Sequence, residues 1–509
     1  MTGARGVLGP SRVPGREDVA RAVAFDTLRA VADGAYANLD LPSRLRRAGV
    51  HGRDAGFATE LVYGTIRMQG FYDAVLAECA GRGVAAIDPE VLDLLRLGAH
   101  QLMGMRVPAH AAVDQSVGLT RRRCGAGAAG FVNAVLRRVS SHDATGWRQR
   151  VVPAGDRDDA LSVRYSHPEW IVAALRAALI GHGLSTPETV AADLVALLHT
   201  DNTPAPVHLV LRAGVTTMED LIREGATPSP ISPVGAVLTG GGDPARIRAV
   251  REARIGVQDA GSQLVALAVA GAPVVDGPAL LPDRAAAGED NGLGAPGREQ
   301  AWLDLCAGPG GKTALLAGLA MQRGVTVYAN DLNQRRADLV TSAVRALVRA
   351  GARVMIGAGD GRQVGTEEPG RYDRVLLDAP CTGLGALRRR PEARWRRRPE
   401  DVAALTALQS QLLASAIAAT RPGGLIGYVT CSPHLAETRE VVAGALRDHP
   451  QVHAVDAQPL LNDAASGPIG DLGDPPYAQL WPHRHGTDAM FLALLRVTRS
   501  GGPSGSGAG

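Results

Sequence analysis

Lysine is almost absent from this sequence. Of the 54 basic residues, one is a lysine, Lys312, and the other 53 are arginines. A GC-rich genome that replaces lysine with arginine wherever only charge matters would explain this bias. On that interpretation, the surviving lysine marks a position where a planar guanidinium cannot replace a compact ammonium. We therefore expect Lys312 to be functional.

Cysteine is also scarce, and this excludes two kinds of architecture. The five cysteines form an odd number and include no C-x-x-C pair, so we expect neither a disulfide framework nor a metal site. Free thiols fit a reducing cytoplasm. The formal net charge of +3 is too small to indicate a nucleic-acid partner by itself, so the local distribution of charge matters more.

Signals for export or membrane insertion are lacking as well. The N-terminal stretch MTGARGVLGPSRVPGRED has no apolar core of the kind that a signal peptide needs. The longest apolar stretch, residues 264–275, is too short and too interrupted by Gly and Pro to span a bilayer. We expect a cytoplasmic monomer that does not contact a membrane.

The length of 509 residues predicts two or three domains. Apolar residues recur at spacings of three and four over residues 16–141, which predicts an all-α domain. Residues 142–245 are mixed and predict a small α/β linker domain. Strand–turn–helix repeats from Trp302 onward predict a doubly wound, mostly parallel sheet within a Rossmann-like domain over residues 246–498. A segment rich in Gly, Pro, Ala and Asp, residues 276–298, predicts a flexible insertion.

The first strand of this sheet runs into the glycine-rich loop DLCAGPGGKT, residues 304–313. Gly308, Gly310 and Gly311 permit a tight turn and a close approach of backbone to ligand, and the helix that follows offers free N–H groups to an anion. A P-loop does not fit well, since the first glycine of its pattern falls on Cys306. A dinucleotide pattern fails at Thr313. S-adenosylmethionine is the third option.

Two carboxylates at later strand ends favour S-adenosylmethionine. Asp331 ends the second strand, where a carboxylate can hold both ribose hydroxyls, and Asp360 follows the third strand, where it could contact adenine. Either residue alone could equally cap a helix or form a turn. We expect the cofactor to contact Cys306, Ala307, Gly308, Pro309, Gly310, Gly311, Lys312, Asp331, Arg336, Asp360, Gly361 and Asp378.

Two thiols follow the next two strands. Cys381 stands after Asp378-Ala-Pro, and Cys431 stands in Thr-Cys-Ser. A thiolate that adds to C6 of cytosine makes C5 able to accept a methyl group, and a carboxylate near N3 and N4 of the ring assists the addition. Asp378 is placed for this task. A lone cysteine is more often a small buried hydrophobe, which is our interpretation of Cys79 and Cys124.

The segments DLCAGPGGKT, DAPCTG and VTCS resemble the RNA cytosine-5 methyltransferases of the Nol/NSUN/Sun superfamily. The resemblance implies that Cys431 is the nucleophile and that Cys381 promotes release of the methylated product. It also implies that Asp331 and Asp360 hold the cofactor, and that Lys312 and Asp378 serve the active site.

The N-terminal segments HGRDAGFATELVYGTIR, GFVNAVLRR and YSHPEWIV are similar to the NusB-like domain and linker of bacterial RsmB/Sun enzymes. This resemblance covers roughly residues 18–275 and 300–497. It implies methylation of C5 of one cytosine of 16S rRNA, at the position usually called 967, through a covalent bond between a cysteine and C6. The implied substrate is 16S rRNA or a small-subunit assembly intermediate.

A basic segment, LRRRPEARWRRRPED, follows the Pro-Cys loop at residues 387–401. Its seven arginines can neutralise phosphates, and its tryptophan can stack on an unpaired base, although a charge run is more often a solvated face. We expect RNA contacts from Arg388, Arg389, Arg390, Arg394, Trp395 and Arg396.

Two other classes of function remain open at this point. GGKT followed by the strand RVLLDAP would also suit a P-loop ATPase. The NusB-like half alone would suit a non-catalytic RNA-binding protein, which would bind RNA but not S-adenosylmethionine.

Overall fold

The computed structural model describes residues 18–240, 242–275 and 299–498. The insertion expected at residues 276–298 lies outside the described residues. The chain divides into two compact units between Ser166 and His167. Each unit is described separately below.

The first unit is helical throughout its described residues, as its sequence periodicity predicts. Its core combines aromatic and aliphatic side chains of α4, α5 and α6, among them Phe71, Leu95 and Leu136. The helices are α1 (Val19–Ala32), α2 (Ala37–Arg47), α3 (Gly52–Arg67), α4 (Gln69–Ala80), α5 (Pro89–Met103), α6 (Ala109–Val139), α7 (Ala144–Val151) and α8 (Asp158–Tyr165).

The first unit continues beyond residue 141, where the sequence pattern placed its end. Trp147 on α7 is buried in the same core as α4 and α5, and its Nε1 donates a hydrogen bond of 2.8 Å to the carbonyl oxygen of Val139. Helix α8 also packs against α4. Because burying an indole removes a large apolar area from water, these two helices stay with the helical unit.

The second unit begins with α9 (Glu169–Gly181) and α10 (Val190–Asp201), followed by a small antiparallel sheet. The sheet order is β2-β3-β1-β4, with β1 (His208–Leu211), β2 (Ala226–Pro228), β3 (Gly235–Leu238) and β4 (Ile255–Val257); α11 (Met218–Arg223) and α12 (Arg248–Arg251) accompany it. Strand β4 pairs with β1, with Leu209 opposite Val257. The boundary expected after residue 245 therefore cuts through this sheet.

The larger sheet has the order β10-β12-β9-β8-β5-β6-β7, and β11 pairs with β12. Strands β9, β8, β5, β6 and β7 are parallel, whereas β12 and β10 are antiparallel to their neighbours. The strands are β5 (Ala301–Asp304), β6 (Thr326–Asp331), β7 (Arg353–Ala358), β8 (Tyr372–Asp378), β9 (Thr420–Thr430), β10 (Val452–Val455), β11 (Ala478–Gln479) and β12 (Phe491–Val497).

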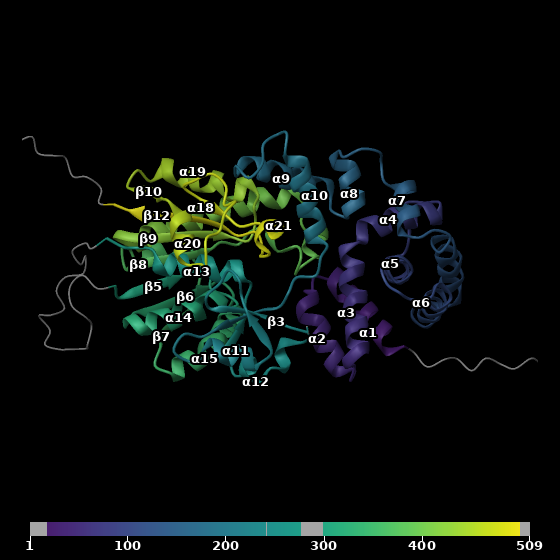
Figure 1. Ribbon diagram of the computed structural model, residues 1–509, viewed down its shortest axis with the longest axis horizontal. Coiled ribbons are helices and arrows are strands. Elements are labelled where there is room, and N and C mark those ends of the chain that lie inside the picture. Colours follow the sequence, from purple (N-terminus) through teal and green to yellow (C-terminus); the bar gives the residue numbers. More distant parts are fainter. Residues whose placement is uncertain (1–17, 241, 276–298, 499–509) are drawn as a thin grey trace, which may run out of the picture. The chain divides into compact units, whose positions relative to one another are not determined.

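Helices cover both faces of this sheet and make a three-layer α/β/α arrangement (Figure 1). One core contains Leu264, Leu316 and Val340 of α13, α14 and α15, and the other contains Leu413 and Val442 of α18 and α19. The helices are α13 (Ala260–Gly271), α14 (Gly311–Arg323), α15 (Gln334–Arg349), α16 (Val364–Glu367), α17 (Ala393–Arg396), α18 (Pro399–Ala419), α19 (Arg439–Asp448), α20 (Ala457–Asp463) and α21 (Pro482–His485).

Strand β8 shows why these segments become central strands. Every residue from Tyr372 to Leu377 is buried, which is the continuous burial typical of a parallel strand covered on both faces. Helix α18 is long and apolar enough to cross a membrane by length and composition. It packs against β8 and β9, so its apolar residues belong to the core of the sheet.

Strand β5 lies between β6 and β8. The chain therefore adds β6 and β7 on one side of β5 and then returns to add β8 and β9 on the other side. Such a reversal of strand order opens a crevice beyond the carboxyl ends of the strands, which is where open α/β sheets bind their ligands. The glycine loop, Asp331, Asp378 and the Thr-Cys-Ser segment all stand at this edge.

Candidate active site

The glycine loop between β5 and α14 is held closely against the end of β6. The N–H of Gly308 donates a hydrogen bond of 3.0 Å to Asp331 Oδ2. A Cβ atom at Gly308 would lie 2.5 Å from that oxygen, so no side chain fits there. Gly310 caps α14 with φ +103°, a left-handed conformation that favours glycine.

The Asp331 carboxylate holds together the glycine loop and Arg336, and we call these three parts the cradle. Its Oδ2 also accepts a bond of 3.0 Å from Arg336 Nε, whose Nη2 donates to the Gly308 carbonyl oxygen at 2.5 Å. Its Oδ1 accepts from the backbone N–H of Asn333 at 3.0 Å. The next residue, Leu332, is 75% exposed and adds an apolar surface beside the carboxylate. The sequence interpretation missed Leu332.

Asp304 and Cys306 lie beneath the loop. Thr313 Oγ1 donates to Asp304 Oδ2 at 2.6 Å, whereas Asp304 Oδ1 has no hydrogen-bond partner among the described residues. Burial raises the pKa of Asp304 to about 7. Burial also raises the pKa of the Cys306 thiol, which packs against the core on the α18 side. Cys306 is therefore a poor nucleophile.

The single lysine joins α14 to the end of the neighbouring strand β8. Lys312 Nζ lies 2.7 Å from Asp378 Oδ2, and the lysine side chain is largely buried. Burial lowers the pKa of Lys312, but the Asp378 carboxylate outweighs it, and the net pKa is raised. The ammonium therefore stays charged and compensates the carboxylate beside the thiols.

Two thiols meet where β8 and β9 end. Cys381 Sγ and Cys431 Sγ are 3.4 Å apart, and both side chains are partly buried. The hydrogen bond from Cys381 is the main cause that lowers the pKa of Cys431; Lys312 acts in the same direction, whereas burial and Asp378 oppose it. The same hydrogen bond, with burial, raises the pKa of Cys381. The shared hydrogen bond therefore moves the pKa values of the two thiols in opposite directions.

A buried glutamate that no sequence motif marked joins the loops that carry these thiols. Glu437 is fully buried, and its carboxylate accepts bonds from the backbone N–H of Thr382 at 2.7 Å and from Ser432 Oγ at 2.6 Å. Thr382 and Ser432 directly follow the two cysteines. Gln409 on α18 donates to the same carboxylate at 3.2 Å.

Asp488, just ahead of β12, is a second residue whose place the sequence interpretation missed. Arg389 Nε donates to Asp488 Oδ1 at 2.9 Å, and the Asp488 N–H donates to Asp259 Oδ1 at 3.0 Å. Asp259 caps α13, the helix after β4. The end of the sheet is thereby tied to the helix that precedes the catalytic strands.

The structure corrects the expectation that the arginine-rich segment forms one RNA-facing cluster. Arg388 and Arg394 are buried, and Arg394 donates to Asn202 Oδ1 at 2.8 Å and to the carbonyl oxygen of Asp201 at 3.2 Å. The Arg394 guanidinium therefore faces the end of α10 and not solvent. Arg389 is held by Asp488, whereas Arg390 is exposed, and Trp395 and Arg396 are half-buried.

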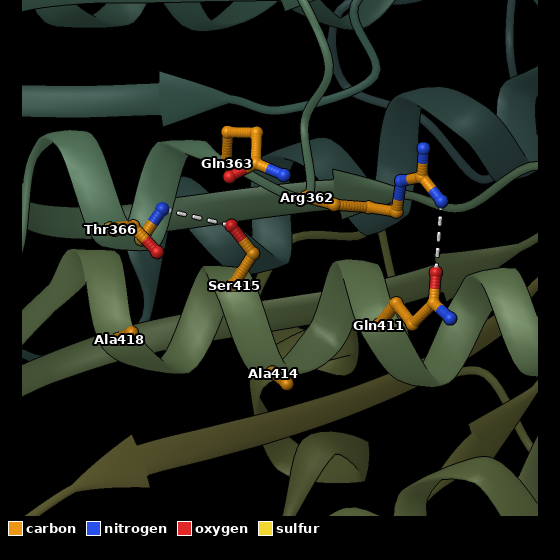
Figure 2. Close-up of a pocket in the computed structure, with 8 residues that line it drawn as sticks. Arg362, Gln363, Thr366, Gln411, Ala414, Ser415 and Ala418 are labelled. Carbon is orange, nitrogen blue, oxygen red and sulfur yellow. Dashed lines mark hydrogen bonds between the residues drawn. The ribbon is translucent and has the colours of Figure 1, made fainter.

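The carboxylate of Asp360 is bound by Arg362, a residue of the same turn. Arg362 clamps the carboxylate with bonds of 2.6 to 3.0 Å, and these bonds lower the pKa of Asp360. Arg362 also reaches Gln411 on α18, on the wall of a pocket of about 530 Å³ between α16 and α18 (Figure 2). Gly361 packs against Leu412. An adenine contact would require Asp360 to share its carboxylate with Arg362.

The expected cofactor and catalytic residues otherwise converge. The glycine loop, Asp331 and Arg336 form one cluster, and Lys312, Asp378 and both thiols form the next. The residues of the loop include Ala307, whose N–H donates to the Asn330 carbonyl oxygen at 2.9 Å, and Pro309, which follows a cis peptide bond.

Comparison with known proteins agrees with this geometry. The NusB family matches residues 18–141, and the family described as 16S rRNA methyltransferase RsmB/F matches residues 293–496. A Mycobacterium tuberculosis (strain H37Rv) protein named as a methyltransferase is 50% identical over 492 residues, which are 96% of this chain and 98% of that protein. The ribosomal RNA small subunit methyltransferase B of Thermus thermophilus is 32% identical over 95% of this chain and 99% of its own length.

The fold is also shared with solved structures. The crystal structure of a protein designated PH0851 superposes with a TM-score of 0.74 at 21% identity, over 96% of this chain and 99% of that chain. Fold and site together define a Rossmann-like methyltransferase with a NusB-like N-terminal domain. The chain belongs to the family of the ribosomal RNA small subunit methyltransferase B proteins, which use S-adenosylmethionine.

Family membership decides between the classes that the sequence left open. A P-loop lysine would reach over phosphates bound by its own loop. Here Lys312 is instead paired with Asp378 at the end of the neighbouring strand. A non-catalytic RNA-binding protein is excluded by the match of the catalytic half to a methyltransferase family.

Proposed function

We propose that this enzyme methylates C5 of a cytosine in 16S rRNA and that Cys431 is its nucleophile. The observation that carries the proposal is the pair of thiols, with their sulfurs 3.4 Å apart, beside the Lys312–Asp378 ion pair. Cytosine C5 needs a nucleophile at C6 before it can accept a methyl group, and a thiolate is the side chain best suited to that addition.

The cradle fits S-adenosylmethionine, which supplies an electrophilic methyl group when it is bound. Gly308 lets the loop pack directly against Asp331 and Arg336, and Asp331 presents a carboxylate beside the exposed Leu332. The unpartnered Oδ1 of Asp304 can accept a hydrogen bond from an ammonium group. We assign Gly308, Asp304 and Asp331 to the cofactor on these grounds, and Asp360 to the adenine end.

The residues of the chain divide the work on the base. Cys431 Sγ adds to C6, and the electron pair of the C5–C6 double bond becomes available at C5. We assign Asp378, whose carboxylate is held by Lys312, to the polar edge of the ring. After C5 has been methylated, a solvent water takes the C5 proton, the C5–H electron pair re-forms the C5–C6 double bond, and the C6–S bond breaks and returns a thiolate to Cys431. Cys381 stabilises that leaving thiolate by donating its hydrogen bond.

We propose that the target cytosine lies at the position usually called 967, within 16S rRNA or an assembling small subunit. The support is the family, whose relatives are named for ribosomal RNA of the small subunit. Within the arginine-rich segment, Arg390, Trp395 and Arg396 remain our candidates for RNA contact, because their side chains reach the surface. We also propose that the enzyme acts in the cytoplasm as a monomer.

Transfer of a tritiated methyl group to 16S rRNA tests the reaction. Cys431→Ser should abolish transfer, and Cys381→Ser should accumulate a covalent protein–RNA complex that survives denaturing gel electrophoresis. Cys124→Ser, on the helical unit, is the matched control and should behave like the wild-type enzyme. Full activity of Cys431→Ser would refute the nucleophile assignment, and free turnover by Cys381→Ser would refute the release role.

The substrate is tested separately. Bisulfite sequencing of 16S rRNA from a deletion strain should show loss of one methylated cytosine, restored by the wild-type gene. In vitro, naked 16S rRNA and small-subunit assembly intermediates should be compared at equal concentrations. An unchanged methylation map in the deletion strain would refute the proposed target.

A further inference from the structure

Glu437 occupies an unusual place between the two cysteine loops. It ends the short 3₁₀ turn Leu435–Glu437, just before α19, and its side chain is fully buried. A buried carboxylate is costly unless its oxygens are satisfied, so such a residue needs a reason to be there. Its surroundings supply that reason.

Four donors converge on the Glu437 carboxylate. Oε1 accepts from the Thr382 N–H at 2.7 Å and from Gln409 Nε2 at 3.2 Å, and Oε2 accepts from Thr382 Oγ1 at 2.5 Å and from Ser432 Oγ at 2.6 Å. Thr382 Oγ1 and Ser432 Oγ are themselves 3.0 Å apart. One carboxylate therefore binds the residue after Cys381 and the residue after Cys431.

The frame around the carboxylate is fixed as well. Gln409 Nε2 also donates to the carbonyl oxygen of Pro380, the residue before Cys381, at 2.8 Å. The hydroxyl of Tyr428 on β9 donates to the Glu437 carbonyl oxygen at 2.7 Å. The backbone on either side of Cys381 is thus tied to a residue that belongs to the chain after Cys431.

We propose that Glu437 is a positioning residue that holds the two sulfurs at hydrogen-bond distance and assigns the shared proton to Cys381, leaving Cys431 as the thiolate. The inference rests on the proposed function for its consequence, because a fixed division of roles matters only if one thiol attacks and the other assists. The division itself concerns the protein alone.

The charges around the thiols agree with this assignment. Cys381 faces Glu437 and Asp378, and both carboxylates raise the pKa of its thiol, after the hydrogen bond to Cys431 and burial. Cys431 faces Lys312, which lowers its pKa, and Asp378 and Asp488, which raise it; the charge of Arg389 also interacts with Cys431. Glu437 accepts two hydrogen bonds from Thr382, the neighbour of Cys381, and one from Ser432, the neighbour of Cys431, so its negative charge favours the proton on Cys381.

Competitive alkylation tests the inference without RNA or cofactor. Wild-type enzyme is treated with iodoacetamide over a range of pH, and modification of each cysteine is measured by peptide mass spectrometry. Since the thiolate is the reactive form, Cys431 should react faster than Cys381 at neutral pH. Glu437→Gln keeps the shape but removes the charge, and we expect the ratio of the two rates to fall about tenfold, the effect of one unit of relative pKa.

Control variants separate positioning from folding. Glu440→Gln changes an exposed glutamate on α19 and should leave the ratio unchanged. Ser432→Ala removes one arm of the frame without changing charge, and should also lower the ratio by loosening the contact between the sulfurs. Thermal melting of each variant shows whether it folds, and only variants that melt as one folded population are compared.

The outcomes are distinct. A ratio within about twofold of wild type in both folded Glu437→Gln and Ser432→Ala would overturn the inference, since a tenfold change is expected for one unit of pKa. If the ratio falls as expected but no cytosine is methylated, the proposed function fails and the assignment of the proton by Glu437 stands.

Discussion

Replacing Arg394 with methionine separates two roles that the arginine-rich segment could have. The side chain is fully buried, and its guanidinium donates to Asn202 Oδ1 at 2.8 Å and to the Asp201 carbonyl oxygen at 3.2 Å. Methionine keeps most of the apolar stem but removes both donors and the charge. We expect this change to destabilise the second unit rather than to weaken RNA binding directly.

The magnitude follows from the burial of the group. Each hydrogen bond from a charged donor contributes about 1.5–3 kcal/mol, and breaking a buried ionic arrangement costs about 3–5 kcal/mol. Asp201 lies fully buried beside this guanidinium, and burial raises the pKa of its carboxyl to about 7 even though Arg394 lowers it. Loss of Arg394 therefore also removes a charge that stabilises a buried carboxylate. We expect a loss of about 3–5 kcal/mol in the free energy of unfolding.

Urea unfolding followed by tryptophan fluorescence measures this loss. Four of the five tryptophans lie after residue 166, so the signal reports mainly on the second unit. Arg390→Met is the matched control, because Arg390 is exposed in the same segment, and it should change stability by less than about 0.5 kcal/mol. RNA affinity is measured for both variants over a series of salt concentrations, at a temperature where both are folded.

The two variants should therefore have opposite effects: Arg394→Met lowers stability, and Arg390→Met weakens RNA binding. Loss of a phosphate contact reduces the dependence of log affinity on log salt by about one unit, and we expect this for Arg390→Met alone. The reasoning is refuted if Arg394→Met costs less than about 1 kcal/mol, the lower end for one hydrogen bond, and at the same time reduces the salt dependence.

Three further predictions concern the buried groups of the second unit. Because the pKa of Asp201 is about 7 in the fold against an ordinary 3.8, the folded state binds the extra proton, so stability falls as pH rises from about 4 to 7. Asp201→Asn should flatten that fall, by at most about 4 kcal/mol, in urea titrations at each pH. Gly308→Ala would place a Cβ atom 2.5 Å from Asp331 Oδ2, and should weaken S-adenosylmethionine binding at least about tenfold by calorimetry, since displaced contacts cost 1–3 kcal/mol; unchanged affinity would contradict the cradle. Lys312→Arg should lower methyl transfer by about 100-fold or more, because a guanidinium cannot take the place of the ammonium beside Asp378; activity within a few-fold of wild type would contradict the argument from the single lysine.

The strand-end residues could be predicted from the sequence because the sheet fixes them. The segments around Leu303, Val327 and Leu376 are largely apolar, so they form buried strands. Parallel strands have their carboxyl ends at the same edge of the sheet. Motifs at the ends of these strands therefore lie close together, and the conformation of the loops does not change this. This is why Asp331 and the two thiols fall where the sequence pattern placed them.

Residues on the connections between strands followed a different rule. The arginine-rich segment reads as a solvent-facing cluster because seven positive charges lie close together in the sequence. Its course is decided instead by partners far away along the chain, Asn202 for Arg394 and Asp488 for Arg389. The sequence of a charged segment does not indicate which of its side chains will be buried and paired.

Glu437 marks the same limit at the centre of the site. Its partner Thr382 lies 55 residues earlier, inside the segment DAPCTG, but Glu437 itself belongs to no periodic pattern and to no spacing with its own chemistry. The thiols can be recognised in the sequence because the proposed reaction needs a sulfur nucleophile. The need for the carboxylate that orients them arises only from the way the two loops pack. One carboxylate is bonded to the neighbours of both cysteines, so the two loops that carry the sulfurs share an anchor. The distance between the sulfurs is then a property of the loop pair, and substitutions around Glu437 should change the division of roles between the thiols before they change the fold.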